Sequence, residues 1–507
     1  MSALHKNALI AVIGAGAMGA GIAQVAAQAG HPVLLLDNRP GAAAQSIDGI
    51  GRQLGKRVEK GKLADSERAA IIARLSAVEA IEALADCALI VEAIVENLEV
   101  KRGLFRQLEA LCSADCILAS NTSSLSITRI AAGLQRPERL LGLHFFNPAP
   151  VMALVEVVSG LASDPALARC LFDTAQAWGK QPVHTRSTPG FIVNRVARPF
   201  YAESLRLLQE GAADCATLDA LMREAGGFAM GAFELTDLIG HDVNYAVTCS
   251  VFDAYYGDTR FQPSLIQQEL VDAGRFGRKS GQGFYRYGAD AQRPEAIEIS
   301  SDALIDRCVV EGDLGLAAGL IPRLQANHIQ VIQRDGAGLL RVGEAVIALS
   351  DGRMASQRAQ QDGLRNLILI DLAFDYASAQ RLAISCSADI SADARAQGVA
   401  LLQRAGLRVS LLSDSPGLAV LRTVAMLANE AADAALHGVA SAADIDLAMR
   451  AGVNYPRGPL AWADAIGLAH VLRTLDHLQA SYGEERYRPS LLLRRKVAEG
   501  SIFHDQP

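Results

Sequence analysis

The sequence of 507 residues lacks the features that mark several classes of protein. Its eight cysteines are scattered and form no C-x-x-C pair, so we expect reduced thiols, mostly in the core, and no metal site. Apolar runs such as Cys87–Val91 are far shorter than the roughly 20 residues that span a bilayer, so no membrane helix is expected. Against 48 Lys and Arg stand 55 Asp and Glu, a net charge of −7, which argues against a nucleic-acid or membrane-surface binder.

The start of the chain has no signal-peptide pattern. Polar residues from Met1 to Asn7 lead directly into the apolar run Ala8–Ile13, so the chain is expected to stay in the cytoplasm. At roughly 150 residues per domain, the length predicts about three domains.

A glycine-rich turn follows the first apolar run. Leu9–Ile13 reads as a buried strand, and Ala20–Ala29 reads as a helix. Gly14, Gly16 and Gly19 lie between them, in the G-x-G-x-x-G spacing that permits a tight turn, close approach of a pyrophosphate and close helix packing. The free N–H groups of the helix start would face the phosphates. This context predicts a dinucleotide site, and a glycine-rich turn of another α/β domain is the alternative.

An acidic residue stands where the adenosine ribose would be bound. The second strand, Val33–Leu36, ends in Asp37, whose carboxylate would accept hydrogen bonds from the ribose hydroxyls and repel a 2′-phosphate. NAD is therefore preferred over NADP, although Arg39 nearby could accommodate that phosphate.

Further strands alternate with helices. The strands are expected at residues 87–91, 116–119, 140–146 and 151–158, and helices such as Leu98–Leu111 separate them. This alternation is typical of an α/β fold with a doubly wound, largely parallel sheet, the Rossmann fold.

Polar residues at the strand ends are the candidates for chemistry. Ser120–Ser124 forms either a ligand-binding loop or a plain turn with a helix cap. His144 is a polar ring in an apolar strand, and Glu156 interrupts the next strand, where a carboxylate is costly unless it is paired. A hairpin-like return could join the two into a general base with a fixed tautomer, whereas a satisfied core histidine is the alternative.

Basic residues recur at helical spacing early in the chain. Arg52, Lys56 and Lys60 are four residues apart and so share one helix face. This face is either simply solvated or a basic track for a phosphate-bearing substrate.

A helical region occurs twice. Thr188–Arg195 recurs as Ser415–Arg422 at an offset of 227 residues, and near the end of the chain Pro263–Leu265 recurs as Pro489–Leu491 at an offset of 226. Asn194 becomes Leu421 in the second copy, so the fold does not require the amide. Lys279 has no counterpart, which makes it a further candidate for function.

A smaller α/β stretch lies between the copies, at residues 289–412. Strands are expected at 328–332, 345–349, 367–372, 381–385 and 409–412, with a helix at 392–404. Its Gly336-x-Gly338 pair lacks a third glycine, so it is interpreted as a degenerate or non-nucleotide module of unknown role. The expected domains are 1–186, 187–288, 289–412 and 413–507.

Together these motifs resemble the L-3-hydroxyacyl-CoA dehydrogenase family over residues 1–288. The similarity rests on Gly14–Gly19, Val91–Asn97, Ser120–Leu125, His144–Pro148, Glu156, Pro189–Arg195 and Gly281–Tyr285. A second C-terminal helical domain is found in the longer bacterial members of the phenylacetate pathway, which oxidise 3-hydroxyadipyl-CoA. The resemblance implies NAD-dependent oxidation of (3S)-3-hydroxyacyl-CoA to 3-oxoacyl-CoA, with an acyl-CoA thioester as substrate.

The resemblance also implies roles for individual residues. His144 would accept the hydroxyl proton, Glu156 would orient the imidazole, and Ser123 and Asn194 would hydrogen-bond the reacting oxygen and the surroundings of His144. The implied NAD contacts are Gly14, Gly16, Gly19, Asp37, Glu96, Lys101, Asn147 and Lys279, and the implied CoA contacts are Lys56 and Lys60. The family forms homodimers through the helical domain.

Two other functions fit the same residues. One is a dehydrogenase of 3-hydroxybutyryl-CoA or of a free hydroxy acid, which would not need the basic track. The other is an NAD-binding protein with a structural or sensing role, which would bind NADH without turnover.

Overall fold

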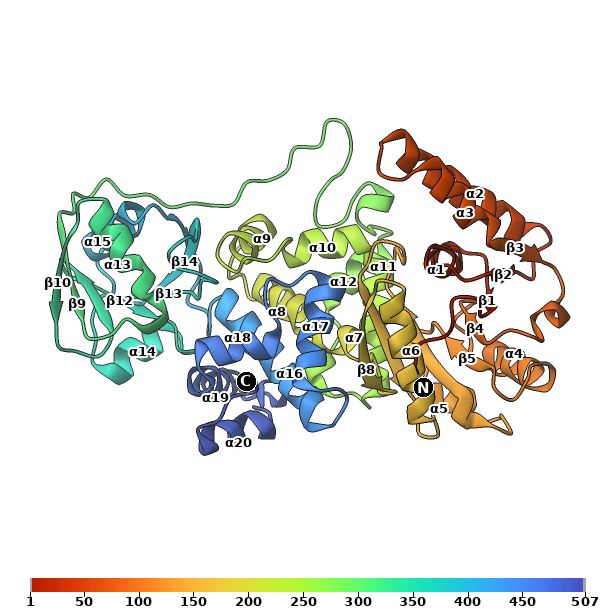
Figure 1. Ribbon diagram of the computed structural model, residues 1–507. Helices are drawn as coiled ribbons and strands as arrows, with labels where there is room; N and C mark the ends of the chain where they lie inside the picture. Colours follow the sequence, from red (N-terminus) through yellow and green to blue (C-terminus); the bar gives the residue numbers. More distant parts are fainter. Residues whose placement is uncertain (1, 505–507) are drawn as a thin grey trace. The chain divides into compact units, whose positions relative to one another are not determined.

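The computed structural model describes residues 2–504, which form two compact units (Figure 1). The first unit contains the residues up to 195 together with 437–453, and the second contains 196–436 and the residues from 454 on. Among the described residues, no helix is both long enough and apolar enough to cross a membrane.

The first unit is built on a sheet of eight strands in the order β3-β2-β1-β4-β5-β6-β7-β8. Its strands are β1 (Ile10–Ile13), β2 (Val33–Leu36), β3 (Leu75–Val78), β4 (Leu89–Glu92), β5 (Ile117–Ser120), β6 (Leu140–Phe145), β7 (Leu154–Ser159) and β8 (Gln181–Arg186). All neighbours are parallel except β6 and β7, which are antiparallel. The order is that of a doubly wound Rossmann sheet, as the sequence predicts.

Both faces of this sheet are covered. Successive side chains of β1 point to opposite faces, so Ile10 and Val12 join one hydrophobic cluster while Ala11 and Ile13 join another. The helices of this unit are α1 (Ala17–Gln28), α2 (Ala42–Glu59), α3 (Asp65–Ala73), α4 (Leu98–Leu111), α5 (Ile127–Ala131), α6 (Pro165–Ala177), α7 (Val193–Val196, at the unit boundary) and α17 (Ala442–Val453), with short 3-10 helices at 81–84 and 137–139.

Helix α17 comes from the second helical copy, yet it belongs to the first unit. The Arg186 N–H at the end of β8 donates to the Val439 carbonyl at 2.8 Å, just before α17. Gly452 of α17 lies so close to the sheet that a Cβ there would be 2.5 Å from Leu154 on β7. The repeat therefore supplies part of the packing of the first sheet.

The second unit holds most of both helical copies. The first copy contributes α8 (Arg198–Gln209), α9 (Cys215–Glu224), α10 (Ala232–Ile239), α11 (His241–Ala254), α12 (Leu265–Asp272) and 3-10 helices η3 (Thr259–Phe261) and η4 (Arg278–Ser280). The second contributes α16 (Val420–Leu436), α18 (Pro459–Ile466), α19 (Leu468–Tyr482), α20 (Leu491–Glu499) and η6 (Glu485–Tyr487). The copies pack through α8 and α16, where buried Arg422 pairs with Glu203 at 2.7 Å.

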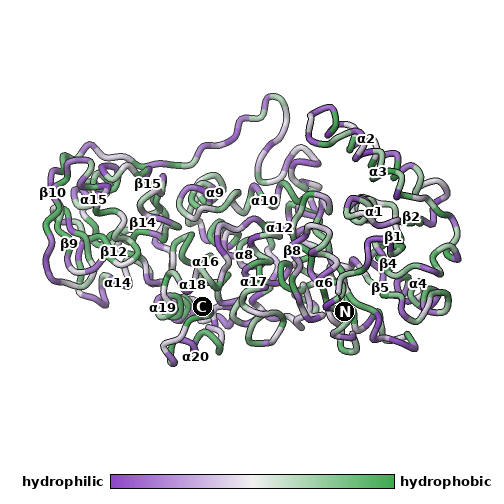
Figure 2. Tube along the Cα trace, in the orientation of Figure 1, coloured by the Kyte–Doolittle hydropathy of each residue, from purple (hydrophilic) through white to green (hydrophobic). Residues whose placement is uncertain are grey.

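The same unit contains the smaller α/β module. After Tyr287 the chain runs as a mostly hydrophilic linker, visible in Figure 2. The module has strands β9 (Arg307–Glu311), β10 (Gln330–Arg334), β11 (Leu339–Val342), β12 (Ala345–Leu349), β13 (Leu367–Ile370), β14 (Arg381–Cys386) and β15 (Arg408–Leu411), in the order β10-β9-β11-β12-β13-β14-β15. Its helices are α13 (Leu320–Ala326), α14 (Ala355–Asp362) and α15 (Ala392–Arg404), with a 3-10 helix at 315–319.

The repeat extends into this module. The pairing β5–β6 parallel, β6–β7 antiparallel, β7–β8 parallel recurs as β12–β13, β13–β14 and β14–β15. Leu154 pairs with Gln181, and 227 residues later Arg381 pairs with Arg408. Helices α6 and α15 also match at this offset. The Gly336-x-Gly338 pair, by contrast, lies in the connection between β10 and β11 and opens no helix.

Candidate active site

His144 and Glu156 face each other on the two antiparallel strands of the first sheet. They are direct partners in the register of β6 and β7, and His144 Nδ1 lies 2.7 Å from Glu156 Oε2. The predicted return of the chain therefore brings the two side chains together. His144 is 6% exposed and Glu156 is fully buried, so water does not compete for their hydrogen bond.

The second oxygen of Glu156 holds the start of the helical region. Glu156 Oε1 accepts the N–H groups of Ile192 and Val193 at 3.0 and 3.1 Å. Gly190 and Phe191 just before them have φ of 76° and 47°, a left-handed turn that points these N–H groups at the carboxylate. One side chain thus orients the imidazole and anchors the segment that leads to Asn194.

The hydrogen bond to Glu156 determines the chemistry of His144. A carboxylate can only accept, so Nδ1 carries the hydrogen and the neutral ring keeps its lone pair on Nε2. The rings of Phe146 and Phe191 lie 4.5 and 5.8 Å from the imidazole and limit its movement. The imidazole is therefore suited to accept a proton at Nε2.

The loop after β5 is held by a second acidic residue. Glu96 Oε1 accepts from the Thr122 hydroxyl at 2.5 Å and from the Ser123 and Ser124 N–H groups at 3.2 Å. Burial raises the pKa of Glu96, but the Thr122 hydrogen bond and the Lys101 charge outweigh it and leave the pKa below its usual value. The ionised Glu96 therefore fixes the backbone that presents Ser123.

Lys101 takes part in the same network from α4. Its ammonium is 1% exposed and pairs with Glu92 at 2.5 Å and with Glu96 at 3.2 Å. Glu92 also accepts from the Ser120 hydroxyl at 2.6 Å. No role was predicted for Glu92, although a buried glutamate directly after an apolar run is a signal similar to that of Glu156, which interrupts one.

The glycine turn leaves room for a phosphate. A Cβ at Gly14 would lie 2.5 Å from the Ala93 carbonyl oxygen, and one at Gly19 would lie 1.7 Å from the Gly14 oxygen. A Cβ at Gly16, the residue before α1, would meet nothing within 4 Å, so open space lies beside the helix start. These residues fit the pyrophosphate of NAD.

A groove of about 700 Å³ runs from this turn along the end of β2. Gly14, Gly16, Asp37 and Arg39 line it together with residues of α4. Asp37 accepts the Ala15 N–H at 2.7 Å and pairs with Arg39 at 3.0 Å. Burial raises the pKa of Asp37, but the hydrogen bonds from Arg39 and Ala15 more than offset this and keep it below the usual value.

A second groove, of about 720 Å³, begins on the other side of the same turn. Gly16 borders both grooves, and Asn147 and Arg57 line the second one. Lys56 on α2 and Lys60, the residue that follows α2, are exposed, but the basic side chain that borders the groove is Arg57. Arg57 was not predicted, because four-residue spacing alone defined the basic face.

Two further lysines differ in their surroundings. Lys279 belongs to the second unit, where its exposed ammonium pairs with Asp242 at 2.6 Å. Lys180 was not predicted: it is buried and donates to the Ala149 and Met152 carbonyls at 2.6 and 2.9 Å. Burial lowers the pKa of Lys180. It fixes the loop that joins β6 to β7.

The first unit contains a dinucleotide-binding turn followed by an acidic residue, and it also contains a histidine held by a carboxylate. Together these features define an NAD-dependent dehydrogenase. The model of the 3-hydroxyacyl-CoA dehydrogenase NAD-binding domain matches residues 9–188, and that of the C-terminal domain matches residues 190–287 and again 417–504. The 3-hydroxybutyryl-CoA dehydrogenase reduced Rossmann-fold domain matches residues 347–416.

Known proteins agree with these matches. The chain is 46% identical over 489 residues to 3-hydroxyadipyl-CoA dehydrogenase of Escherichia coli, covering 96% of this chain and 97% of that protein. A crystal structure described as 3-hydroxybutyryl-CoA dehydrogenase from Escherichia coli matches with a TM-score of 0.89 and 45% identity, covering 98% of this chain and 99% of that one. A probable 3-hydroxybutyryl-CoA dehydrogenase of Deinococcus radiodurans is 41% identical over 54% of this chain and 99% of its own length.

The chain therefore belongs to the 3-hydroxyacyl-CoA dehydrogenase family. It is an oxidoreductase that uses NAD and acts on 3-hydroxyacyl-CoA thioesters.

Proposed function

We propose that the chain oxidises a (3S)-3-hydroxyacyl-CoA whose acyl group ends in a second carboxylate, with 3-hydroxyadipyl-CoA as the preferred substrate, and that His144 is its general base. The buried hydrogen bond of 2.7 Å between His144 and Glu156 carries the proposal for the mechanism. The 46% identity to a 3-hydroxyadipyl-CoA dehydrogenase supports the choice of substrate.

The proton of the substrate hydroxyl moves to His144 Nε2. The ring then becomes an imidazolium whose Nδ1–H already donates to the fully buried Glu156 carboxylate. A charge-assisted hydrogen bond of this kind is stronger than a neutral one, so Glu156 lowers the energy of the protonated base. Bound NAD supplies the acceptor for the hydride that leaves C3.

Other residues position the reactants. Ser123 and Asn194 donate hydrogen bonds to the reacting oxygen and the surroundings of His144. Gly14, Gly16 and Gly19 admit the pyrophosphate, Asp37 binds the ribose, and Asn147 lines the adjoining groove. Lys56 and Lys60, with Arg57 between them, attract the phosphates of CoA, since all three are exposed cations at the C-terminal end of α2.

The competing substrate is 3-hydroxybutyryl-CoA, which is named in the description of the similar crystal structure. We would measure kcat/KM in NADH formation for 3-hydroxyadipyl-CoA, 3-hydroxybutyryl-CoA and 3-hydroxyhexadecanoyl-CoA. We expect the adipyl thioester to exceed the butyryl one by at least tenfold. A butyryl value equal to or above the adipyl value would contradict the proposed substrate while leaving the base intact.

The role of the basic face has its own test. Lys60→Glu should raise the KM for a CoA thioester several-fold, because it places a negative charge beside the phosphates, and should leave kcat unchanged. Arg495→Glu, at an exposed basic residue of α20, is the matched control. An unchanged KM in Lys60→Glu would show that CoA binds elsewhere.

We also propose a cytoplasmic location and a homodimer. Light scattering should give twice the mass of the 53.7 kDa chain. A single-chain mass would instead mean that the duplicated copies pair only within one chain.

A further inference from the structure

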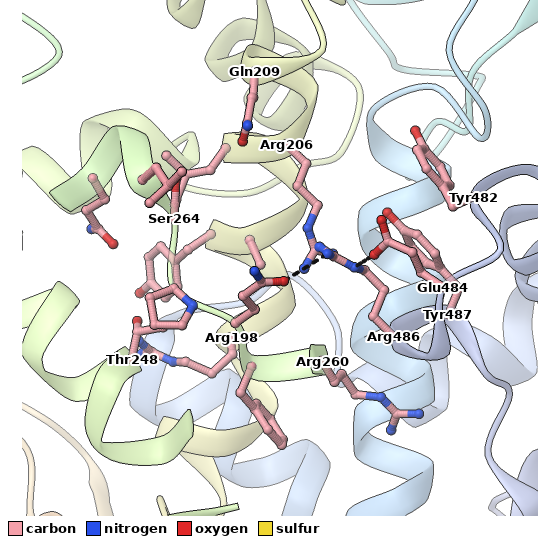
Figure 3. A pocket seen from close by; sticks show the side chains of 18 of the residues that line it. Arg198, Arg206, Gln209, Thr248, Arg260, Ser264, Tyr482, Glu484, Arg486 and Tyr487 are labelled. Carbon is pink, nitrogen blue, oxygen red and sulfur yellow. Dashed lines mark hydrogen bonds and ion pairs between the residues drawn. The ribbon is translucent and has the colours of Figure 1, made fainter. Parts of the chain in front are cut away.

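A cavity of about 450 Å³ lies between the two helical copies, and all of its lining residues belong to the second unit. Four arginines line it: Arg198, Arg206, Arg260 and Arg486. Figure 3 shows Arg206 and Arg486 entering the cavity from the two copies, while Arg198 lies beside Thr248. A cavity of this size is in the range of small-molecule sites and is larger than a single inorganic ion requires.

Arg198 is the least satisfied cation of the cavity. It is 5% exposed, and Nη1 donates to the Thr248 hydroxyl at 3.0 Å. Its Nε has no hydrogen-bond partner, and within residues 2–504 no carboxylate pairs with the guanidinium. A buried charge without a counter-ion is costly, so an anion in the cavity would remove an existing penalty.

A comparison of the two helical copies shows how a second cationic position arises in the cavity, apart from Arg198. In the second copy, Glu430 and Asp433 of α16 pair with Arg260 of η3. At the same offset, the first copy has Glu203 and Arg206, so an arginine stands where the second copy has an aspartate. Arg486 of η6 is the counterpart of Arg260. It therefore faces the cation Arg206 at the position where Arg260 faces Asp433.

Some of this charge is neutralised locally. Arg206 pairs with Glu203 at 2.6 Å, and Arg486 pairs with Glu484 and donates to the Gln262 side chain at 3.1 Å. Glu203, however, also pairs with Arg422 at 2.7 Å. Arg422 also pairs with Glu210 at 2.9 Å, so the charges of these pairs balance. Among the described residues Arg206 donates to Glu203 through Nη1, and its remaining N–H groups can donate to an anion in the cavity.

The spacing of the arginines favours an elongated ligand. Arg198 and Arg206 are eight residues apart on one face of α8, about 12 Å along the axis. The residues between them that line the cavity, Tyr201, Ala202 and Leu205, present aromatic and aliphatic surface. Two cationic positions separated by an apolar strip suit an anion at each end of a short hydrocarbon chain.

We propose that this cavity binds a linear dicarboxylate of about six carbons, with one carboxylate at Arg198 and Thr248 and the other at Arg206 and Arg486. The ligand differs from a CoA thioester because it is a free diacid. Its site is built entirely from residues outside the unit that carries His144 and Glu156.

Calorimetric titration of the full chain with adipate tests the proposal. NAD and acetoacetyl-CoA, the oxidised forms of the cofactor and of the substrate, are present at saturation so that the substrate site is filled without turnover. We expect one adipate per chain, and at least tenfold weaker binding of hexanoate, which has one carboxylate. Absence of adipate binding at 10 mM, or equal affinity for hexanoate, would overturn the proposal.

Two variants locate the site. Arg198→Gln and Arg206→Gln should each weaken adipate at least tenfold, because each removes one charge-assisted contact. Arg494→Gln, an exposed arginine of α20 that pairs with Asp476, should change the affinity less than twofold. Wild-type affinity in both cavity variants would place adipate elsewhere and contradict the proposal.

Thermal unfolding provides a readout if one variant folds poorly. Adipate should raise the melting temperature of the wild type and not that of either cavity variant. Without adipate, Arg198→Gln should melt no lower than the wild type, because the substitution removes an unpaired buried charge. A markedly lower melting temperature in Arg198→Gln, together with an unchanged response of Arg206→Gln to adipate, would show a purely structural role.

Discussion

The strand pairs β6–β7 and β13–β14 are the same structure with different chemistry. Gly142 pairs with Val158, and 227 residues later Leu369 pairs with Ser385. In the same register, the pair His144 and Glu156 of the first copy becomes Asp371 and Ala383 in the second, joined by the Asp371 N–H and the Ala383 carbonyl at 3.0 Å. Duplication kept the fold and replaced the histidine.

One contact survives the replacement. Asp371 accepts the N–H groups of Ala419 and Val420 at 2.9 and 2.7 Å, at the positions that match Ile192 and Val193. Gly417 and Leu418 repeat the left-handed turn, with φ of 74° and 55°. The carboxylate on the helix start is therefore an element of the fold, whereas His144 and Asn194 are the parts that only the first copy keeps.

The substitution His144→Gln removes the feature that separates the copies. We expect kcat to fall about a hundred- to ten-thousand-fold, because the general base is lost while the fold is kept. NADH consumption with acetoacetyl-CoA measures the effect. His184→Gln is the control, since His184 lies on the nearby strand β8 and stacks on Phe172. Activity within threefold of the wild type would rule out His144 as the base.

Asp371→Ala should separate folding from catalysis. Burial raises the pKa of Asp371 to about 6, against the hydrogen bonds from the backbone, so it is ionised at pH 7.5. Removing it leaves several buried N–H groups without a partner, at a cost of about 3 kcal/mol in unfolding free energy. Urea unfolding should show this loss, while kcat of the folded protein changes less than twofold.

The exposed Asp389 provides the matching control, because Asp389→Ala removes a carboxylate of the same module at little cost. A tenfold loss of kcat in folded Asp371→Ala would mean that the second copy takes part in the reaction.

The sequence was sufficient to predict those features that a local motif or a residue spacing defines. The glycine turn, the offset of 227 and the His144–Glu156 pair all follow from residue types and spacing, and helix 392–404 is correct at both ends. Four strands were missed: β3, β8, β9 and β11. Three of them are of mixed burial, such as Gln181–Arg186, and β11 is a run of only four residues. Pairing with a neighbouring strand, and not a local pattern, makes such segments strands.

The exchange of helices between the two copies could not be predicted from the sequence either. The repeat was recognised from Pro189 and Pro416 onward, because the strands before them share register but few residue types. Helix α17 packs on β7 and β8, while its counterpart α9 packs on β14. Each copy thus covers the sheet of the other, an isologous arrangement that only three-dimensional contacts display.

Gly452→Val tests this exchange. A side chain at Gly452 would meet Leu154 at 2.5 Å and Val193 at 3.2 Å, so we expect a loss of about 1–3 kcal/mol in stability from overpacking. Because the Val193 N–H also holds Glu156, kcat should fall as well. Gly55→Val on α2, where only the end of Arg68 lies within 4 Å, is the control. Equal melting temperatures of the two variants would argue against tight packing of α17.

The smallest expected effect concerns acid stability of the second copy. His470 of α19 stands where the first copy has Val243, and burial lowers its pKa to about 4. The unfolded chain therefore binds a proton at pH 5.5 that the folded chain does not, so stability is complete above about pH 6.5 and falls on acidification. Between pH 7 and pH 5.5 the unfolding free energy should drop by about 1 kcal/mol from this group. His470→Gln should remove that part of the pH dependence in urea unfolding, and an unchanged slope would show that His470 is not the group responsible.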